Sequence, residues 1–568
     1  MIKGYESWLE NCTDAELKNE LLSIKGDEEK INDRFYCELT FGTGGLRGEI
    51  GAGANRMNIY TVGKATQGLA DYLKQAFEQP SVAISHDNRK NSDIFADHAA
   101  AILAANGVKV YMYPVLEPTP MLSYATRYFN CSGGIMITAS HNPAVYNGYK
   151  VYGPDGCQIT DEAAHAIEEC INRVDIFDGI TIAPLDELVR SGKIEYIGDE
   201  CIESYQQMIA KLAPGSEEKA AALSIVYTPL NGTGRVPVQE ALRRAGFNNV
   251  TIVKEQEMPD PAFPTCPYPN PEIREALELG IRKMKETGAD LLLATDPDCD
   301  RVGTAVWDHG ELRLMTGNEI GVLLMDYVCK NRMETGTMPK DPVMVKTIVT
   351  TEQAEGIAAH YGIELRDVLT GFKYIGEQIG LLEKEGHPER YLLGFEESYG
   401  YLSGTDVRDK DGVNAALLIC RMTADWKARG LSLADALRDV QKRFGAYEQG
   451  LESITFRGEN GMKEMKRIME CLRKDPPKSI MGLALTRVED YLQKTSVDVV
   501  TGEVTPITLP TSNVLKFRFG KEATLVARPS DTEPKLKLYY AVSADTDPLA
   551  VEKLKQFKAA VRPMIDSL

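Results

Sequence analysis

Residues 82–84 (Val-Ala-Ile), 94–105 (Ile-Phe-Ala-Asp-His-Ala-Ala-Ala-Ile-Leu-Ala-Ala) and 108–111 (Val-Lys-Val-Tyr) have the pattern of a strand, a helix and a second strand. Ahead of them, residues 63–77 place apolar side chains at helical spacing on one face, namely Ala65, Leu69, Tyr72, Leu73, Ala76 and Phe77. Alternating helices and strands indicate parallel strands covered by helices. We therefore predict an α/β fold.

The same alternation continues along most of the chain. Short apolar runs predict strands near 133–138, 223–227, 250–253, 290–294, 343–347 and 391–394. The last segment has closely spaced strands at 514–518, 523–527 and 536–543. Polar or glycine-containing stretches at 190–200, 308–317 and 445–450 separate the series. We predict three α/β domains with mixed or parallel sheets and a smaller C-terminal α+β domain, at residues 1–195, 196–312, 313–447 and 448–568.

Composition narrows the class of protein. The 568 residues suggest about four domains. The formal charge of −19 repels nucleic acid and anionic membranes. No apolar run approaches the length of a membrane span, and the first residues lack the apolar core of a signal peptide. The 11 cysteines contain no Cys-x-x-Cys pair, which fits a reducing compartment. We expect a cytoplasmic protein.

The segment Thr138-Ala139-Ser140-His141-Asn142-Pro143 directly follows a predicted strand. Ligands of open parallel sheets bind at the carboxyl ends of the strands, so the Ser140 hydroxyl can face a ligand. Serine and Asn-Pro also favour turns and helix caps. By spacing alone, the turn or helix cap is the favoured interpretation.

A second strand leads into Asp296-Pro297-Asp298-Cys299-Asp300-Arg301. Carboxylates at alternate positions of an extended loop point the same way and repel one another unless a cation binds. Mg²⁺ keeps few protein ligands and leaves room for a phosphate oxygen. An EF-hand needs Gly and Glu where Arg301 and Trp307 stand. The alternative is a solvated acidic turn, and the position at a strand end favours the metal site.

Three further segments carry polar chemistry. In residues 394–400, Gly-Phe-Glu-Glu-Ser-Tyr-Gly, the carboxylates suit sugar hydroxyls, although a helix start explains them equally well. Residues 528–535, Arg-Pro-Ser-Asp-Thr-Glu-Pro-Lys, suit a phosphate or form a charged hairpin loop. Residues 42–48, Gly-Thr-Gly-Gly-Leu-Arg-Gly, lack the Gly-Lys-Ser/Thr of a nucleotide-binding P-loop.

Together these motifs resemble the α-D-phosphohexomutase family, which includes phosphoglucomutases and phosphomannomutases. The resemblance runs from Gly42 to Lys537, with the motifs in the family's order, and residues 146–150 and 228–234 support it. The segments Tyr-Asn-Gly-Tyr-Lys at 146–150 and Gly-Phe-Glu-Glu at 394–397 are similar to those of the branch that holds many bacterial phosphoglucomutases and the animal phosphopentomutase. The resemblance implies four domains around a central cleft, three of them α/β and the last α+β.

The resemblance also implies a role for each matched residue. Ser140 would be the phosphoserine and would bind Mg²⁺ with Asp296, Asp298 and Asp300. The residues that manage protons or charge would be Arg47, His141, Lys150 and Lys410. The residues that contact the sugar and its phosphate would be Arg301, Thr370, Gly371, Lys373, Glu396, Ser398, Arg528, Ser530, Asp531 and Thr532.

Two positions depart from the family pattern. Relatives usually carry a small residue such as Ala or Gly at Cys299, and Gly or sometimes Asn at Asp531. Gly, Asn and Asp tolerate a left-handed backbone better than other residues do. We therefore expect the Asp531 backbone N–H to face the phosphate and its side chain to face water.

We therefore expect an isomerase that interconverts glucose 1-phosphate and glucose 6-phosphate, with glucose 1,6-bisphosphate as intermediate and activator. Mannose and pentose phosphates are the alternative substrates. A haloacid dehalogenase-type phosphatase needs Thr or Val where Asp300 stands and leaves Ser140 unexplained. A non-catalytic phosphosugar sensor does not need Ser140, the three aspartates and Lys410. The expected partner is a small phosphosugar, and the expected assembly is a monomer or homodimer.

Overall fold

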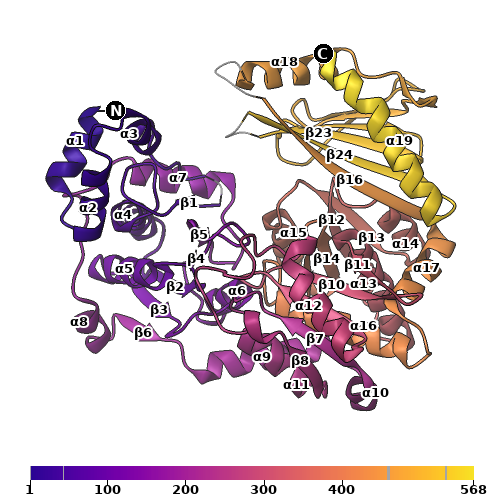
Figure 1. The fold of residues 1–568 in the computed structure, drawn as a ribbon, viewed down its shortest axis with the longest axis horizontal. Helices are drawn as coiled ribbons and strands as arrows, with labels where there is room; N and C mark the ends of the chain where they lie inside the picture. The colour runs from indigo at the N-terminus through magenta and orange to yellow at the C-terminus, as the bar shows by residue number, and fades with distance from the viewer. Residues whose placement is uncertain (1, 43, 457–460, 531–533) are drawn as a thin grey trace. The chain divides into compact units, whose positions relative to one another are not determined.

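The structure is a computed structural model and describes residues 2–42, 44–456, 461–530 and 534–568. The chain forms two compact units (Figure 1). The first unit contains Met1–Gly317, Ile375–Gly394 and Ser398–Ser432, and the second contains Asn318–Tyr374, Phe395–Glu397 and Leu433–Leu568. Within the described ranges, no helix is long and apolar enough to cross a membrane.

The first sheet has the strand order β1-β5-β4-β2-β3-β6. Four strands are parallel, namely β2 (Ser81–His86), β3 (Lys109–Met112), β4 (Gly133–Ile137) and β6 (Ile194–Tyr196). Two strands add antiparallel at one edge, namely β5 (Tyr146–Tyr152) and β1 (Leu46–Glu49). The helices of this region are α4 (Ile59–Ala76), α5 (Ser92–Ala105), α6 (Thr119–Tyr128), α7 (Asp161–Ile171) and α8 (Leu185–Arg190). Small side chains of α5 such as Ala96 and Ala99 are fully buried, so this helix packs closely on the sheet.

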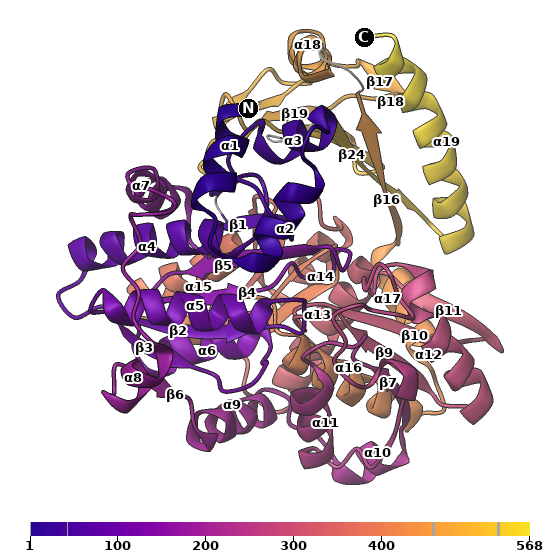
Figure 2. The same ribbon diagram turned by 60° about the vertical axis from the view of Figure 1, so that its left-hand side comes forward.

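Three short helices precede this sheet, namely α1 (Ile2–Asn11), α2 (Ala15–Ser23) and α3 (Glu28–Phe35). They have their own apolar cluster around Trp8 (Figure 2). Asp14 and Asp27 cap the N-termini of α2 and α3 by accepting backbone N–H groups. The sequence analysis did not predict these helices.

The second sheet has the strand order β11-β10-β9-β7-β8. Its parallel strands are β7 (Ser224–Thr228), β8 (Asn249–Ile252) and β9 (Leu291–Thr295). Its antiparallel strands are β10 (Val302–Asp308) and β11 (Glu311–Met315). The helices here are α9 (Asp199–Leu212), α10 (Glu217–Ala222), α11 (Arg235–Arg244), η1 (Lys254–Gln256) and α12 (Arg274–Thr287).

The third sheet has the strand order β13-β12-β14-β15. Its strands are β12 (Val343–Thr347), β13 (Glu364–Val368), β14 (Tyr391–Glu396) and β15 (Gly400–Ser403). The helices of this part of the chain are α13 (Gly317–Glu334), α14 (Gln353–Tyr361), α15 (Lys373–Lys384), η2 (Pro388–Arg390), α16 (Gly412–Lys427) and α17 (Leu433–Phe444).

The C-terminal region is an antiparallel sheet of seven strands in the order β16-β24-β23-β22-β19-β20-β21. The strands are β16 (Ala446–Thr455), β19 (Arg487–Asp490), β20 (Thr495–Asp498), β21 (Val504–Pro506), β22 (Leu515–Phe519), β23 (Ala523–Pro529) and β24 (Lys535–Ala544), beside a hairpin of β17 (Ser479–Ile480) and β18 (Leu483–Ala484). Buried and partly exposed residues alternate along β24. One face packs on α18 (Gly461–Lys474) and α19 (Asp547–Asp566), which share an apolar core with it (Figure 1).

The predicted fold class is confirmed, since three regions combine helices with parallel strands and the last is rich in antiparallel strands. Each strand predicted from an apolar run is present. The added antiparallel strands β1, β5, β10 and β11 make the first two sheets mixed.

Candidate active site

Ser140 stands just beyond β4, in a backbone conformation that a non-glycine residue rarely adopts, with φ 52°. Its Oγ donates a hydrogen bond to Asp296 Oδ2 at 2.9 Å and lies 3.1 Å from His141 Nδ1. Its N–H donates to Thr138 Oγ1 at 2.8 Å. The turn therefore directs the serine oxygen toward the acidic loop of the second sheet.

Two buried residues that the sequence analysis missed hold this serine loop. The Arg89 guanidinium donates to four backbone carbonyls of the loop, those of Ser140 and Asn142 at 2.5 Å, Pro143 at 2.9 Å and Tyr146 at 3.0 Å. Asp87 lies 3.2 Å from Arg89 and accepts the Thr138 hydroxyl at 2.6 Å. The signal in the sequence was Asp87-Asn88-Arg89 directly after β2, which is parallel to β4 and ends at the same edge.

Asp296, Asp298 and Asp300 converge just beyond β9. All three are buried, and a carboxylate oxygen of each lies within 4.8 Å of the other two. The loop is a turn and not the extended segment that we predicted, because Cys299 takes φ 53° and its N–H donates to Asp296 O at 2.9 Å. The turn still brings the three carboxylates together.

The electrostatics of this triad indicate a missing positive charge. Burial and the neighbouring carboxylates raise the pKa of Asp296, and burial and Asp298 raise the pKa of Asp300. Oδ1 of Asp298 and Oδ1 of Asp300 are buried without a hydrogen-bond partner among the described residues. Carboxylate oxygens are the ligands that Mg²⁺ prefers in proteins. The residues present therefore fit a divalent cation.

Two lysines supply part of the missing charge. Lys150 Nζ lies 2.8 Å from Asp298 Oδ2, and Lys410 Nζ lies 3.2 Å from Asp300 Oδ2. Burial by itself would raise the pKa of Asp298, but the Lys150 ammonium outweighs it, so the pKa is lowered. Burial would lower the pKa of Lys150, but Asp298 and Asp300 raise it, so this side chain stays charged.

His141 next to the serine is a neutral imidazole. Burial and the positive charge of Arg301 lower the pKa of His141 to about 2. The more distant charge of Arg47, an exposed residue of β1, lowers it further. Arg301 itself forms an ion pair with Glu272. His141 therefore contacts Ser140 without adding a charge.

Close backbone contacts join the neighbouring loops to the acidic turn. Gly412 N donates to Cys299 O at 3.1 Å, and a Cβ at Gly412 would lie 2.4 Å from that oxygen. Thr233 donates to Pro297 O through both its N–H and its hydroxyl, at 2.8 and 2.9 Å. The loop that carries Lys410 therefore lies against the acidic turn. The sequence analysis noted these segments but gave Gly412 and Thr233 no role.

The second unit holds the predicted sugar-contacting residues other than Ser398 and Arg301. Glu396 is buried at the end of β14, Gly371 takes φ 119° beside Thr370, and the Lys373 ammonium lies 5.0 Å from the centre of a tyrosine ring. Between Glu396 and Ser398, the missed residue Glu397 accepts two threonine hydroxyls, from Thr350 at 3.0 Å and Thr347 at 3.2 Å. Burial and Glu396 raise the pKa of Glu397 to about 7.

Arg528 lies on β23, directly opposite Lys537 of β24. Like charges that face each other across two strands repel unless an anion lies between them. Ser530 N donates to Lys535 O at 2.8 Å. Asp531 and Thr532 lie outside the described residues. The second unit therefore places two cations, Arg528 and Lys537, on the strands next to the predicted phosphate-binding segment. Lys537 was not predicted from the sequence.

Comparison with known proteins agrees with this geometry. Models of domains I, II and III of the phosphoglucomutase/phosphomannomutase family match residues 38–176, 203–309 and 316–444. A phosphoglucomutase from Staphylococcus saprophyticus is 36% identical over 95% of this chain and 96% of its own length. One from Staphylococcus haemolyticus is 38% identical over 90% and 91%. The pp63/parafusin structure from Paramecium shares the fold, with a TM-score of 0.70, 17% identity and coverage of 93% of this chain and 95% of that one.

The three family domains and the phosphoglucomutase relatives identify a mutase, an enzyme of the isomerase class. The chain belongs to the phosphoglucomutase/phosphomannomutase family.

Proposed function

We propose that the enzyme interconverts glucose 1-phosphate and glucose 6-phosphate through a phosphoserine at Ser140 and a bisphosphorylated sugar. The observation that carries this proposal is the hydrogen bond from Ser140 Oγ to Asp296, one of three buried aspartates whose carboxylate oxygens lie together. The serine would donate its phosphoryl group to the sugar and recover the other phosphate. The name of the staphylococcal relatives supports glucose as the sugar.

Asp296, Asp298 and Asp300 would hold Mg²⁺ together with an oxygen of the serine phosphate. When bound, the ion would neutralise negative charge on the transferring phosphoryl group. Lys150 and Lys410 would place positive charge at the same site, since Lys150 lies beside Asp298 and Lys410 beside Asp300.

The other residues would bind the sugar and its second phosphate. Arg47 and His141 would complete the transfer site. We assign the sugar and phosphate contacts to Arg301, Thr370, Gly371, Lys373, Glu396, Ser398, Arg528, Ser530, Asp531, Thr532 and also Lys537. The boundaries 1–195, 196–312, 313–447 and 448–568 would separate the serine, metal, sugar and phosphate domains. All 11 cysteines are free, which supports a reducing cytoplasm.

A panel of phosphosugars tests the proposal. Glucose, mannose, N-acetylglucosamine and ribose 1-phosphates are each assayed with Mg²⁺ and a fixed catalytic amount of the matching bisphosphate. We expect the highest kcat/KM for glucose 1-phosphate. A higher value for mannose or ribose would reject glucose as the preferred sugar, and release of inorganic phosphate as the main product would reject the mutase reaction.

A further inference from the structure

The helices α1–α3 lie ahead of the region that the family models match, and they pack against the chain that follows β1. Trp8 makes edge-to-face ring contacts with Tyr60 and Phe177, each at 5.4 Å. Ala52, three residues beyond β1, is fully buried in the same apolar cluster. Figure 2 shows the three helices grouped beside β1 and α4. The helices thus have a docking site at the end of the strand that carries Arg47.

A polar clamp accompanies this apolar contact. Glu20 of α2 accepts the N–H of Ala52 at 2.9 Å, and Arg34 of α3 donates to the carbonyl of Ala52 at 3.0 Å. Glu20 and Arg34 also pair with each other at 2.5 Å. Both backbone groups of Ala52 are therefore held by charged side chains, and bonds to charged groups are among the stronger hydrogen bonds.

The two glycines beside Ala52 lie close to Glu20 and Arg34. Gly51 has φ 154° and Gly53 has φ 132°. A Cβ at Gly51 would lie 2.9 Å from a Glu20 carboxylate oxygen, and one at Gly53 would lie 2.9 Å from the Arg34 backbone oxygen. Residues 51–53 can therefore reach both helices only without side chains at these two positions.

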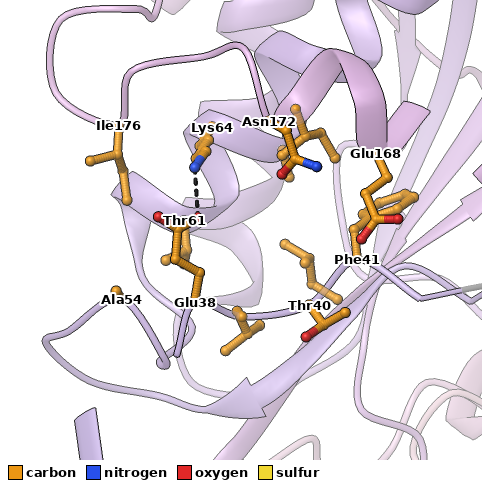
Figure 3. A pocket seen from close by; sticks show the side chains of 13 residues that line it. Glu38, Thr40, Phe41, Ala54, Thr61, Lys64, Glu168, Asn172 and Ile176 are labelled. Carbon is orange, nitrogen blue, oxygen red and sulfur yellow. Dashed lines mark hydrogen bonds and ion pairs between the residues drawn. The ribbon is translucent and has the colours of Figure 1, made fainter. Parts of the chain in front are cut away.

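Packing alone does not fix β1. It is an edge strand and pairs only with β5 among the strands that the structure describes. A cavity of about 170 Å³ lies beside it, lined by Phe41, Leu46 and the ion pair of Lys64 with Glu38 (Figure 3). This cavity contains none of the proposed catalytic residues. With a ladder partner on one side and a cavity beside it, an edge strand has fewer contacts that oppose displacement than an inner strand.

The residue of β1 whose position bears on the proposed reaction is Arg47. Arg47 lies opposite Gly148 of β5, whose carbonyl accepts the N–H of Thr138 at 3.1 Å, two residues before Ser140, so β1 is linked to the serine loop through β5. We propose that α1–α3 are a positioning clamp, in which Glu20 and Arg34 hold Ala52 and thereby place Arg47 for phosphoryl transfer. This inference rests on the proposed function, in which Arg47 takes part in the transfer. Glu20 and Arg34 are positioning residues and do not touch substrate.

A double-mutant cycle between Glu20 and Arg47 tests the clamp. Glu20→Ala removes the acceptor of the Ala52 N–H while keeping a good helix former in α2. Since small misplacements of reacting groups cost up to about a hundredfold in rate, we expect kcat to fall by about tenfold to hundredfold with little change in KM. In an Arg47→Ala background, Glu20→Ala should cause no further loss, because the residue that it positions is gone. Glu20→Gln keeps an acceptor oxygen and should recover much of the rate.

The matched control is Glu16→Ala, one turn earlier on α2, where the exposed side chain pairs with the exposed Lys90. It should leave kcat unchanged. Thermal unfolding of each variant shows whether the fold survives, and if Glu20→Ala does not fold, the same cycle is measured with Arg34→Lys. Equal losses from the Glu20 substitution in both backgrounds would overturn the clamp, as would full activity of Glu20→Ala. Full activity of Arg47→Ala would instead reject the role of Arg47 in the proposed function.

Discussion

At the scale of single residues, the site depends on a serine in a strained turn. Ser140 takes φ 52° because Arg89 and Thr138 hold the loop around it. Strain of this kind persists only where surrounding contacts enforce it, and it is common at functional sites. The network around Arg89 therefore holds the serine loop in this conformation.

The first prediction concerns Ser140→Ala. Since the hydroxyl is the proposed phosphoryl carrier, turnover should fall by about a thousandfold or more while the unfolding temperature changes little. Intact-mass measurement after incubation with glucose 1,6-bisphosphate should show a phosphate adduct on the wild type and none on the variant. Ser191→Ala, an exposed serine, is the control. Wild-type turnover by Ser140→Ala would reject covalent transfer through this residue.

The second prediction concerns the metal. Chelation should abolish activity, and added Mg²⁺ should restore it, because Oδ1 of Asp298 and Oδ1 of Asp300 are buried and accept no hydrogen bond from the described residues. Asp298→Asn should lower kcat far more than it raises KM, since the ion acts mainly on the transition state. Activity that persists after exhaustive chelation would contradict the metal assignment.

At the scale of elements, the site forms where loops from different sheets make close backbone contact, as at Gly412 and Cys299.

The third prediction is that Gly412→Ala lowers turnover at least about tenfold in a folded protein. Its Cβ would lie 2.4 Å from the Cys299 carbonyl oxygen, so the loop with Lys410 must move away from Asp300. Gly198→Ala is the control, because a Cβ there meets nothing within 4 Å. Unchanged kcat in Gly412→Ala would show that the two loops need no close contact.

The fourth prediction concerns the β23–β24 ladder. Lys537 faces Arg528 across the two strands, and we expect both to bind the substrate phosphate. Lys537→Met should raise KM about tenfold or more with a smaller effect on kcat, whereas Lys537→Arg should stay close to the wild type. Steady-state kinetics at low ionic strength measures both. A Met variant with wild-type KM would remove Lys537 from the phosphate site.

At the scale of the whole molecule, the chain is acidic, with a formal charge of −19, and yet its proposed substrate is an anion. Cations are nevertheless gathered locally and buried in parts of the molecule. In the second unit, Lys346 and Lys516 are fully buried and pair with Asp367 at 2.9 Å and Glu352 at 2.7 Å. Lys516 belongs to the C-terminal sheet and Glu352 precedes α14, so this ion pair joins the two regions of the unit.

The fifth prediction concerns Glu355, a neighbour of Glu352 in this ion pair. A hydrogen bond with Glu352, and then burial, raise the pKa of Glu355 to about 7. Its stabilising contribution is therefore complete below the ordinary glutamate pKa and is lost as the pH rises toward 7. We expect Glu355→Gln to become more stable relative to the wild type between pH 5 and pH 8. Thermal unfolding of both proteins across this range measures the difference, and a constant difference would contradict the raised pKa.

The strands and the candidate reacting groups could be predicted from the amino-acid sequence. Apolar periodicity is a local property, so the strands β2, β3, β4, β9 and β12 could be predicted from runs of a few residues. The motifs around Ser140 and Asp296 stand at strand ends, where ligands of parallel sheets bind. The order of four motifs was enough to indicate the family.

Which of these groups meet is seen in the folded structure. Ser140 and Asp296 are 156 residues apart, and no local pattern predicts their hydrogen bond. Arg89 was missed because a buried arginine that serves backbone carbonyls carries no periodic signal. The turn at Cys299 was predicted as extended, since its φ depends on contacts from Gly412 and Asp296. Local structure follows from neighbouring residues, whereas the site follows from packing between loops that are distant in the chain.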